Sequence, residues 1–123
     1  MGNPFVHVEL HTKDITKAKK FYKGLFSWDL KEIPEMGYTL INAGEGTGGG
    51  MCEGCDDSSG WRAYVLVEDI QVATKKAASL GAKIVSEVQE VAGAGWLSVI
   101  ADPTGAILGL WQPKGPSLNS PWT

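Results

Sequence analysis

The stretch FVHVELHTKDITKAKKFYKGLF, residues 5–26, joins two periodic patterns and decides the fold. From Val6 to His11, apolar and ionisable residues alternate, which is typical of a strand with one buried face. From Asp14 onward, apolar residues recur three and four positions apart, which predicts an amphipathic helix that Asp14 caps. An amphipathic helix needs a partner for its apolar face, so the stretch predicts a helix packed on a sheet.

The same strand-to-helix step occurs a second time, 55 positions later, where Asp69 takes the place of Asp14. The second helix is expected over DIQVATKKAASLG, and Gly81 suits the left-handed position that ends a helix. Three strands are expected after each helix, so the chain reads as two tandem βαβββ modules. The expected strands after the helices are 28–33, 38–42 and 49–52 in the first module and 83–87, 96–101 and 106–112 in the second.

Length and composition restrict the class of protein. With 123 residues, 43% hydrophobic and 20% charged, the chain is expected to be one globular domain, with modules at about 4–54 and 60–113 and a tail at 114–123. A net charge of −3 argues against a broad basic surface for nucleic acid. No apolar run approaches the ~20 residues of a membrane span, and the N-terminus lacks a signal-peptide pattern, so we expect a cytoplasmic protein that binds no membrane.

The alternation in the first strand raises the question of which face carries the ionisable side chains. If the helix packs on the apolar residues of that strand, then His7, Glu9 and His11 point away from it. In the second module, Arg62 and Tyr64 occupy the corresponding face. We therefore expect an α+β fold in which a curved mixed sheet surrounds a polar-lined cavity and the helices lie outside.

The two cysteines, Cys52 and Cys55 in CEGC, allow three interpretations: they bind metal, exchange disulfides or do neither. A structural zinc site normally needs a second pair of ligands. A redox CxxC is expected at a strand-to-helix step, whereas this pair lies among glycines and acidic residues. We therefore expect two reduced cysteines near a loop.

Three features are shared with one known family: the paired βαβββ unit, the segment FYKGLFSW and the ending DPTGAILGL. Together they cover about residues 5–113 and resemble the vicinal oxygen chelate superfamily, which contains glyoxalase I, bleomycin-resistance proteins, fosfomycin-resistance enzymes and extradiol dioxygenases. The resemblance is closest to small glyoxalase-like proteins whose last strand ends in GLWQ. It implies, for the enzymes, a divalent metal between the modules, held by one residue from the first and one from the last strand of each module.

Carried over position by position, the resemblance leaves one ligand of that metal. His7 matches, because it lies seven positions before Asp14. The corresponding second-module position holds Arg62, a permanent cation. Gly109 stands where a family enzyme with DPxGxxxE carries its glutamate, and the segment GTGGGM offers no carboxylate or imidazole. We therefore predict no cofactor; the alternative is a divalent metal displaced toward His7 and Glu9.

The other candidate site residues are expected to line the cavity. We expect His7, Glu9 and Arg62 to form a polar cluster, in which Arg62 either grips a carboxylate or phosphate of a ligand or pairs with Glu9. Tyr64 and Trp111 are either apolar walls of the cavity with polar edges or plain core. Trp96, which alternation places on the same face as Ser98 and Ile100, is an aromatic candidate for the cavity mouth.

Two functions from different classes follow from the resemblance. The first is a metal-independent protein that binds a small organic molecule without turnover, as bleomycin-resistance proteins do. The second is a glyoxalase-like lyase or isomerase in which His7 and Glu9 are catalytic, around a displaced metal or as a metal-free acid and base. The resemblance also implies a homodimer, and the tail PKGPSLNSPWT with Trp122 is either a loose end or an arm across a partner.

Overall fold

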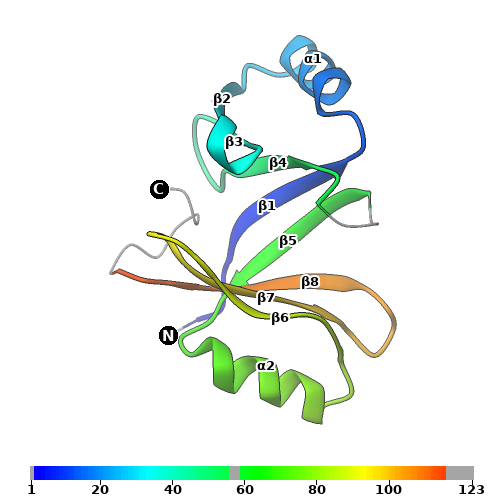
Figure 1. Ribbon diagram of the computed structural model, residues 1–123, viewed down its shortest axis with the longest axis vertical. Helices are drawn as coiled ribbons and strands as arrows, with labels where there is room; N and C mark the ends of the chain where they lie inside the picture. The colour runs from blue at the N-terminus through cyan, green and yellow to red at the C-terminus, as the bar shows by residue number, and fades with distance from the viewer. Residues whose placement is uncertain (1, 56–58, 116–123) are drawn as a thin grey trace. The chain divides into compact units, whose positions relative to one another are not determined.

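The computed structural model describes residues 2–55 and 59–115, and it confirms the α+β fold with two tandem βαβββ modules (Figure 1). None of the helices in these ranges is long and apolar enough to cross a bilayer. The elements, in chain order, are β1 Phe5–Thr12, α1 Ile15–Leu25, β2 Asp29–Ile33, the 3₁₀ turn η1 Pro34–Met36, β3 Tyr38–Asn42, β4 Gly49–Glu53, β5 Gly60–Leu66, α2 Ile70–Ser79, β6 Lys83–Val91, β7 Gly95–Ala101 and β8 Ile107–Pro113.

The chain forms two compact units, which divide within β1 and within β5. The first unit consists of residues 7–62, and the second joins the residues before His7 to those from Ala63 onward. Each helix begins at the predicted aspartate. The side chains of Asp14 and Asp69 each accept a hydrogen bond from a backbone N–H three residues later, at 3.0 and 3.1 Å.

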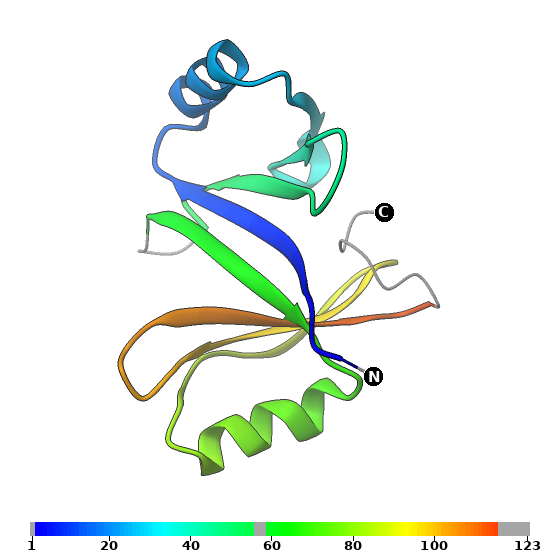
Figure 2. The same ribbon diagram turned by 180° about the vertical axis from the view of Figure 1, so that it is seen from behind.

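The first unit is a mixed sheet with the strand order β2-β3-β4-β1, in which β4 and β1 are parallel and the other pairs antiparallel. Figure 2 shows β4 running beside β1. Leu10, Ile41 and Met51 form the core on one face of the sheet. Ile15 and Tyr22, both from α1, pack against this core. The apolar side of β1 therefore faces the helix, as the alternation predicted.

The second unit has the order β5-β8-β7-β6, with β5 and β8 parallel and the other pairs antiparallel. Val67, Ile70 and Leu110 form the core between α2 and the sheet. Beside them the buried Thr74 hydroxyl lies 2.9 Å from the Ser98 hydroxyl, which ties α2 to β7. Figure 1 shows α2 running along this sheet. The opposite face carries a separate core cluster of Val6, Tyr64, Leu66 and Trp111.

The end of β4 corrects one expectation. Cys52 and Cys55 are joined by a disulfide, with 6.0 Å between their Cα atoms, so the expectation of two reduced cysteines is wrong. The reason is the turn between them: Gly54 has a φ of +63° and donates its N–H to the Thr12 carbonyl oxygen at 3.0 Å, which folds the chain back. Trp122 and most of the tail lie outside the described residues.

Candidate functional site

A buried polar cluster lies on the face of the first unit's sheet that points away from α1. Alternation along β1 places His7, Glu9 and His11 on this face, opposite Leu10. His7 is 1% exposed and His11 is 5% exposed, so both imidazoles are inside the protein. Tyr38, from β3, completes the cluster and is also buried.

Glu9 is the acceptor at the centre of this cluster. Its Oε2 atom lies 2.8 Å from the Tyr38 hydroxyl, and its Oε1 atom lies 2.7 Å from His11 Nε2. The Tyr38 hydroxyl is also 2.7 Å from His7 Nε2. Tyr38 therefore joins His7 to Glu9, and His11 binds the Glu9 carboxylate directly.

The directions of these hydrogen bonds follow from which groups can donate. An ionised carboxylate only accepts, so Tyr38 and His11 must donate to Glu9. The single hydroxyl hydrogen of Tyr38 is then used, so His7 Nε2 carries a hydrogen and donates to the tyrosine oxygen. The chain of donors runs from His7 through Tyr38 to Glu9.

The position of Tyr38 depends on a glycine in the strand between it and β1. In register, Tyr38 is opposite Cys52, whereas Gly50 is opposite Glu9. The tyrosine ring therefore has to lie diagonally over position 50 to reach Glu9. A Cβ atom at Gly50 would lie 2.0 Å from the Tyr38 hydroxyl oxygen, so no other residue fits beneath the ring.

Burial and hydrogen bonding hold both ionisable groups in their deprotonated forms at neutral pH. Burial lowers the pKa of His7 from 6.5 to about 4, although the Glu9 carboxylate acts in the opposite direction. Burial raises the pKa of Glu9, but hydrogen bonds from His11 and Tyr38 and the nearby imidazoles outweigh it, so this pKa ends below its usual range. His7 is therefore a neutral imidazole beside an ionised carboxylate, 4.0 Å away.

The positions of the family's metal ligands can now be compared with this geometry. Glu9 and Tyr64 are equivalent positions of the two modules, and they pair in register with Gly50 and Gly109. Both last-strand ligand positions are therefore glycines. A Cβ atom at Gly109 would lie 2.3 Å from the Tyr64 ring, just as one at Gly50 would meet Tyr38. A carboxylate fits at neither position, so the residues present do not match the family's ligand set.

The remaining predicted site residues separate into two groups. Arg62 is buried in β5, and Tyr64 and Trp111 share the core cluster on the face of the second unit opposite α2. Trp96 lies on the other face, where it packs against the α2 core. The reason is its register: Trp96 is opposite Gln112, one position from Trp111, and neighbouring positions point to opposite faces.

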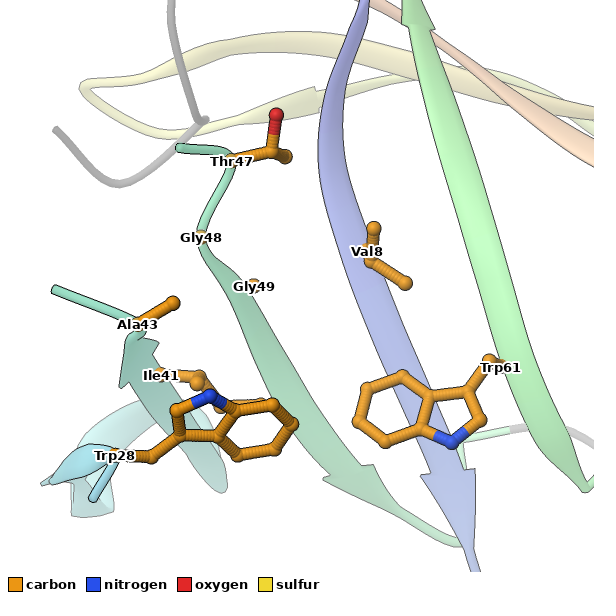
Figure 3. Close-up of a pocket in the computed structure, with 8 residues that line it drawn as sticks. All are labelled: Val8, Trp28, Ile41, Ala43, Thr47, Gly48, Gly49 and Trp61. Atoms are coloured by element: carbon orange, nitrogen blue, oxygen red, sulfur yellow. The ribbon is translucent and has the colours of Figure 1, made fainter. Parts of the chain in front are cut away.

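A small apolar pocket lies on the opposite face of the first unit's sheet from the polar cluster (Figure 3). It encloses about 260 Å³, and the rings of Trp28 and Trp61 stand 6.2 Å apart at its edge. The pocket is lined by Val8, Trp28, Ile41, Ala43, Thr47, Gly48, Gly49 and Trp61. Its lining is almost entirely apolar, so it suits a hydrocarbon or aromatic group rather than a charged one.

Sequence reasoning missed Tyr38, Trp28 and Trp61. The only signal for Tyr38 is the glycine run GTGGGM, because a strand without side chains leaves space for a large side chain from its neighbour. Which neighbour supplies that side chain depends on the register between β3 and β4, which the sequence pattern does not specify.

Removing the central hydroxyl tests the cluster. We expect Tyr38→Phe to lower the free energy of unfolding by about 2 kcal/mol, because Glu9 loses a donor and His7 loses an acceptor inside the protein. Urea unfolding measures the change. Tyr22→Phe, in the aromatic cluster beside α1, is the matched control and should change stability by less than about 0.5 kcal/mol. Equal stability of Tyr38→Phe and the natural protein would contradict the network.

Comparison with known proteins agrees with this fold and these motifs. Residues 4–44 match the family model "Bleomycin resistance protein-like N-terminal". The fold matches the crystal structure of a glyoxalase/bleomycin resistance protein/dioxygenase superfamily member from Vibrio splendidus 12B01, with a TM-score of 0.66, 16% identity and coverage of 90% of this chain and 99% of that one. Together with the curated relatives described next, these matches support the vicinal oxygen chelate superfamily that the motifs predicted.

Two curated relatives are more similar in sequence. CFP32 of Mycobacterium bovis, provisionally called a glyoxylase, is 34% identical over 116 residues, covering 85% of this chain and 44% of the relative. The anthracycline biosynthesis protein DnrV of Streptomyces peucetius is 25% identical over 123 residues, covering 85% of this chain and 45% of the relative. The chain thus spans less than half the length of the curated relatives it matches.

Proposed function

We propose that this protein binds a small organic molecule without a divalent metal and without turning it over. The observation that carries the proposal is the pair of glycines, Gly50 and Gly109, at the last-strand positions where the family enzymes hold their metal. A tyrosine ring covers each glycine, and Arg62 occupies a third position of the ligand set. Of these four positions, His7 alone keeps a side chain that can donate a lone pair.

The polar cluster supplies the groups that would orient a ligand. His7, Tyr38 and Glu9 form a connected network, and such networks hold their members in fixed positions when each hydrogen bond is made. Arg62 would add a cation with a planar set of donors that suits a carboxylate or phosphate.

The charge states support binding over turnover. An efficient general acid or base has a pKa near the working pH. The pKa of His7 is lowered to about 4, and that of Glu9 is also lowered, so both groups are weak bases at neutral pH. Neither group is in its acidic, protonated form at neutral pH.

One observation favours the second candidate, a metal-free lyase or isomerase. The donor chain from His7 through Tyr38 to Glu9 is an uninterrupted route for a proton between an imidazole and a carboxylate. In that case His7 and Glu9 are the catalytic residues. The homodimer implied by the resemblance stays a prediction alongside both candidates.

A metal assay separates the proposal from a metal-dependent enzyme. We expect protein purified without chelator to contain far less than one Zn, Ni, Mn or Fe per chain by elemental analysis. His7→Ala should contain no less metal than the natural protein. A stoichiometric metal that disappears in His7→Ala would contradict the proposal and favour the enzyme.

A binding assay tests the proposal directly. Because the relatives and the family model are named for an anthracycline pathway and bleomycin resistance, we would titrate the protein with an anthracycline and with bleomycin. We expect saturable binding of at least one probe, weakened about tenfold by Glu9→Gln, which corresponds to about 1.4 kcal/mol. Glu87→Gln, an exposed carboxylate of β6, should leave the affinity unchanged. Equal affinity of Glu9→Gln and the natural protein would place the ligand elsewhere.

A further inference from the structure

The disulfide at the end of β4 lies directly beside the polar cluster. In register, Cys52 is opposite His11 on β1 and opposite Tyr38 on β3. Side chains of directly opposite residues point to the same face of a sheet, and neighbouring strands lie about 4.7–4.9 Å apart. Cys52 therefore sits in one row between two members of the cluster.

The two sulfur atoms differ in access to solvent. Cys52 is 8% exposed and lies within β4, whereas Cys55 is exposed in the turn that follows. A thiol in solution can therefore approach Cys55 without opening the sheet. Attack on an exposed sulfur with a buried partner defines which sulfur is bonded to the incoming thiol and which one leaves.

The turn is held in place by contacts that do not need the disulfide. The Gly54 N–H donates to the Thr12 carbonyl oxygen at 3.0 Å, and the Glu53 carboxylate accepts from the Ile15 N–H at 2.8 Å, at the start of α1. These two bonds hold Glu53 and Gly54, the two residues between the cysteines. The turn can therefore keep its shape when the sulfur–sulfur bond is broken, which a reversible redox pair requires.

We propose that Cys52 and Cys55 form a reversible thiol–disulfide exchange site whose oxidation state is transmitted to His11 and Tyr38. In the reduced state the covalent tether between β4 and its following turn is absent, and Cys52 carries a hydrogen-bonding thiol between its two neighbours. The inference goes beyond the proposed function, because it concerns an exchange with cellular dithiols and does not depend on which molecule the cluster binds.

The exchange balances with a dithiol as the only co-reactant. One thiolate of the dithiol attacks the Cys55 sulfur, a mixed disulfide forms, the Cys52–Cys55 bond breaks, and the Cys52 thiolate takes up a proton. The second thiolate of the dithiol then attacks the first dithiol sulfur, which is bonded to Cys55 in the mixed disulfide. This step breaks that bond, and the released Cys55 thiolate takes up a proton. The protein gains two electrons and two protons, and the dithiol becomes a disulfide.

The test uses the folded protein in buffers that contain reduced and oxidised dithiothreitol in varied ratios. Free thiols are trapped with an alkylating agent in a denaturing quench, which also exposes Cys52, and are counted by mass spectrometry, while circular dichroism before the quench follows the fold. We expect a single reversible transition in which both thiols appear together and the fold is kept. Cys55→Ser and Cys52→Ala should each show one alkylated thiol at every ratio.

The imidazole NMR signals of His11 and His7 report whether the change reaches the cluster. We expect the His11 signals to shift between the two states in the natural protein and to stay fixed across the same buffers in Cys55→Ser. Three results would overturn the inference: thiols that appear only when the protein unfolds, thiols that do not reoxidise, or a complete transition with unmoved His11 signals. None of these measurements uses a bound ligand, so their results do not depend on whether the protein binds a small molecule.

Discussion

Gly50→Ala is expected to lower the free energy of unfolding by about 3 kcal/mol. The new Cβ atom would lie 2.0 Å from the Tyr38 hydroxyl oxygen and 2.2 Å from the adjoining ring carbon. The ring has to move away, and it then loses its hydrogen bonds to Glu9 and His7 inside the protein. Overpacking and the loss of a bond to a charged group therefore act together.

A double-mutant cycle identifies the tyrosine as the cause. In the Tyr38→Ala background the obstructing ring is gone, so adding Gly50→Ala should cost less than about 1 kcal/mol. Gly24→Ala, in α1 with no atom within 4 Å of its new Cβ, should instead stabilise the protein by up to about 1 kcal/mol. Urea unfolding gives all the values. Equal costs of Gly50→Ala in both backgrounds would mean that the ring does not lie over Gly50.

Acidification from pH 7 to pH 4 is expected to remove about 3 kcal/mol of stability through His7 alone. The pKa of His7 falls from 6.5 to about 4 on folding, so between these values the unfolded chain binds a proton that the folded protein excludes. Stability therefore declines as the pH falls below 6.5, and the decline levels off below about 4. Glu9 acts in the same direction below pH 4.5, because its pKa is also lowered.

Comparison with a variant that cannot titrate isolates this contribution. We expect His7→Gln to be less stable than the natural protein at pH 7 but to lose about 3 kcal/mol less between pH 7 and pH 4. Exposed carboxylates with lowered pKa values, such as Glu32 and Asp102, contribute equally to both proteins and cancel. Urea midpoints measured at closely spaced pH values give the two curves. Parallel curves would show that folding does not lower the pKa of His7.

The sequence was sufficient for the order and type of the elements, because each βαβββ module is marked by its own periodicity. Alternation along β1 gave the correct faces, and the aspartate at each helix start appears in the structure as a capping side chain. Local patterns of this kind are repeated within a few residues, so they can be read without knowing what lies across the sheet.

The sequence pattern did not specify the register between strands or which side chains meet across neighbouring strands. Tyr38 joins the cluster only because β3 pairs with β4 at Cys52 and β4 presents Gly50 beneath the ring. The disulfide depends on Gly54, whose positive φ turns the chain after β4, and this turn is independent of any strand-to-helix step. That Trp96 faces away from Trp111 follows from the antiparallel pairing of β7 with β8, not from the pattern of its own strand. Each of these misses concerns a relation between strands.

The glycines beneath the two tyrosine rings also limit how this protein can change. Glutamate cannot be introduced at Gly50 while Tyr38 is present, or at Gly109 while Tyr64 is present, since the same volume would be occupied twice. Removing a tyrosine first would leave a void beside a glycine, which is itself destabilising. Evolution or design toward a chelating variant therefore needs paired replacements on neighbouring strands, because each single substitution on the way lowers stability.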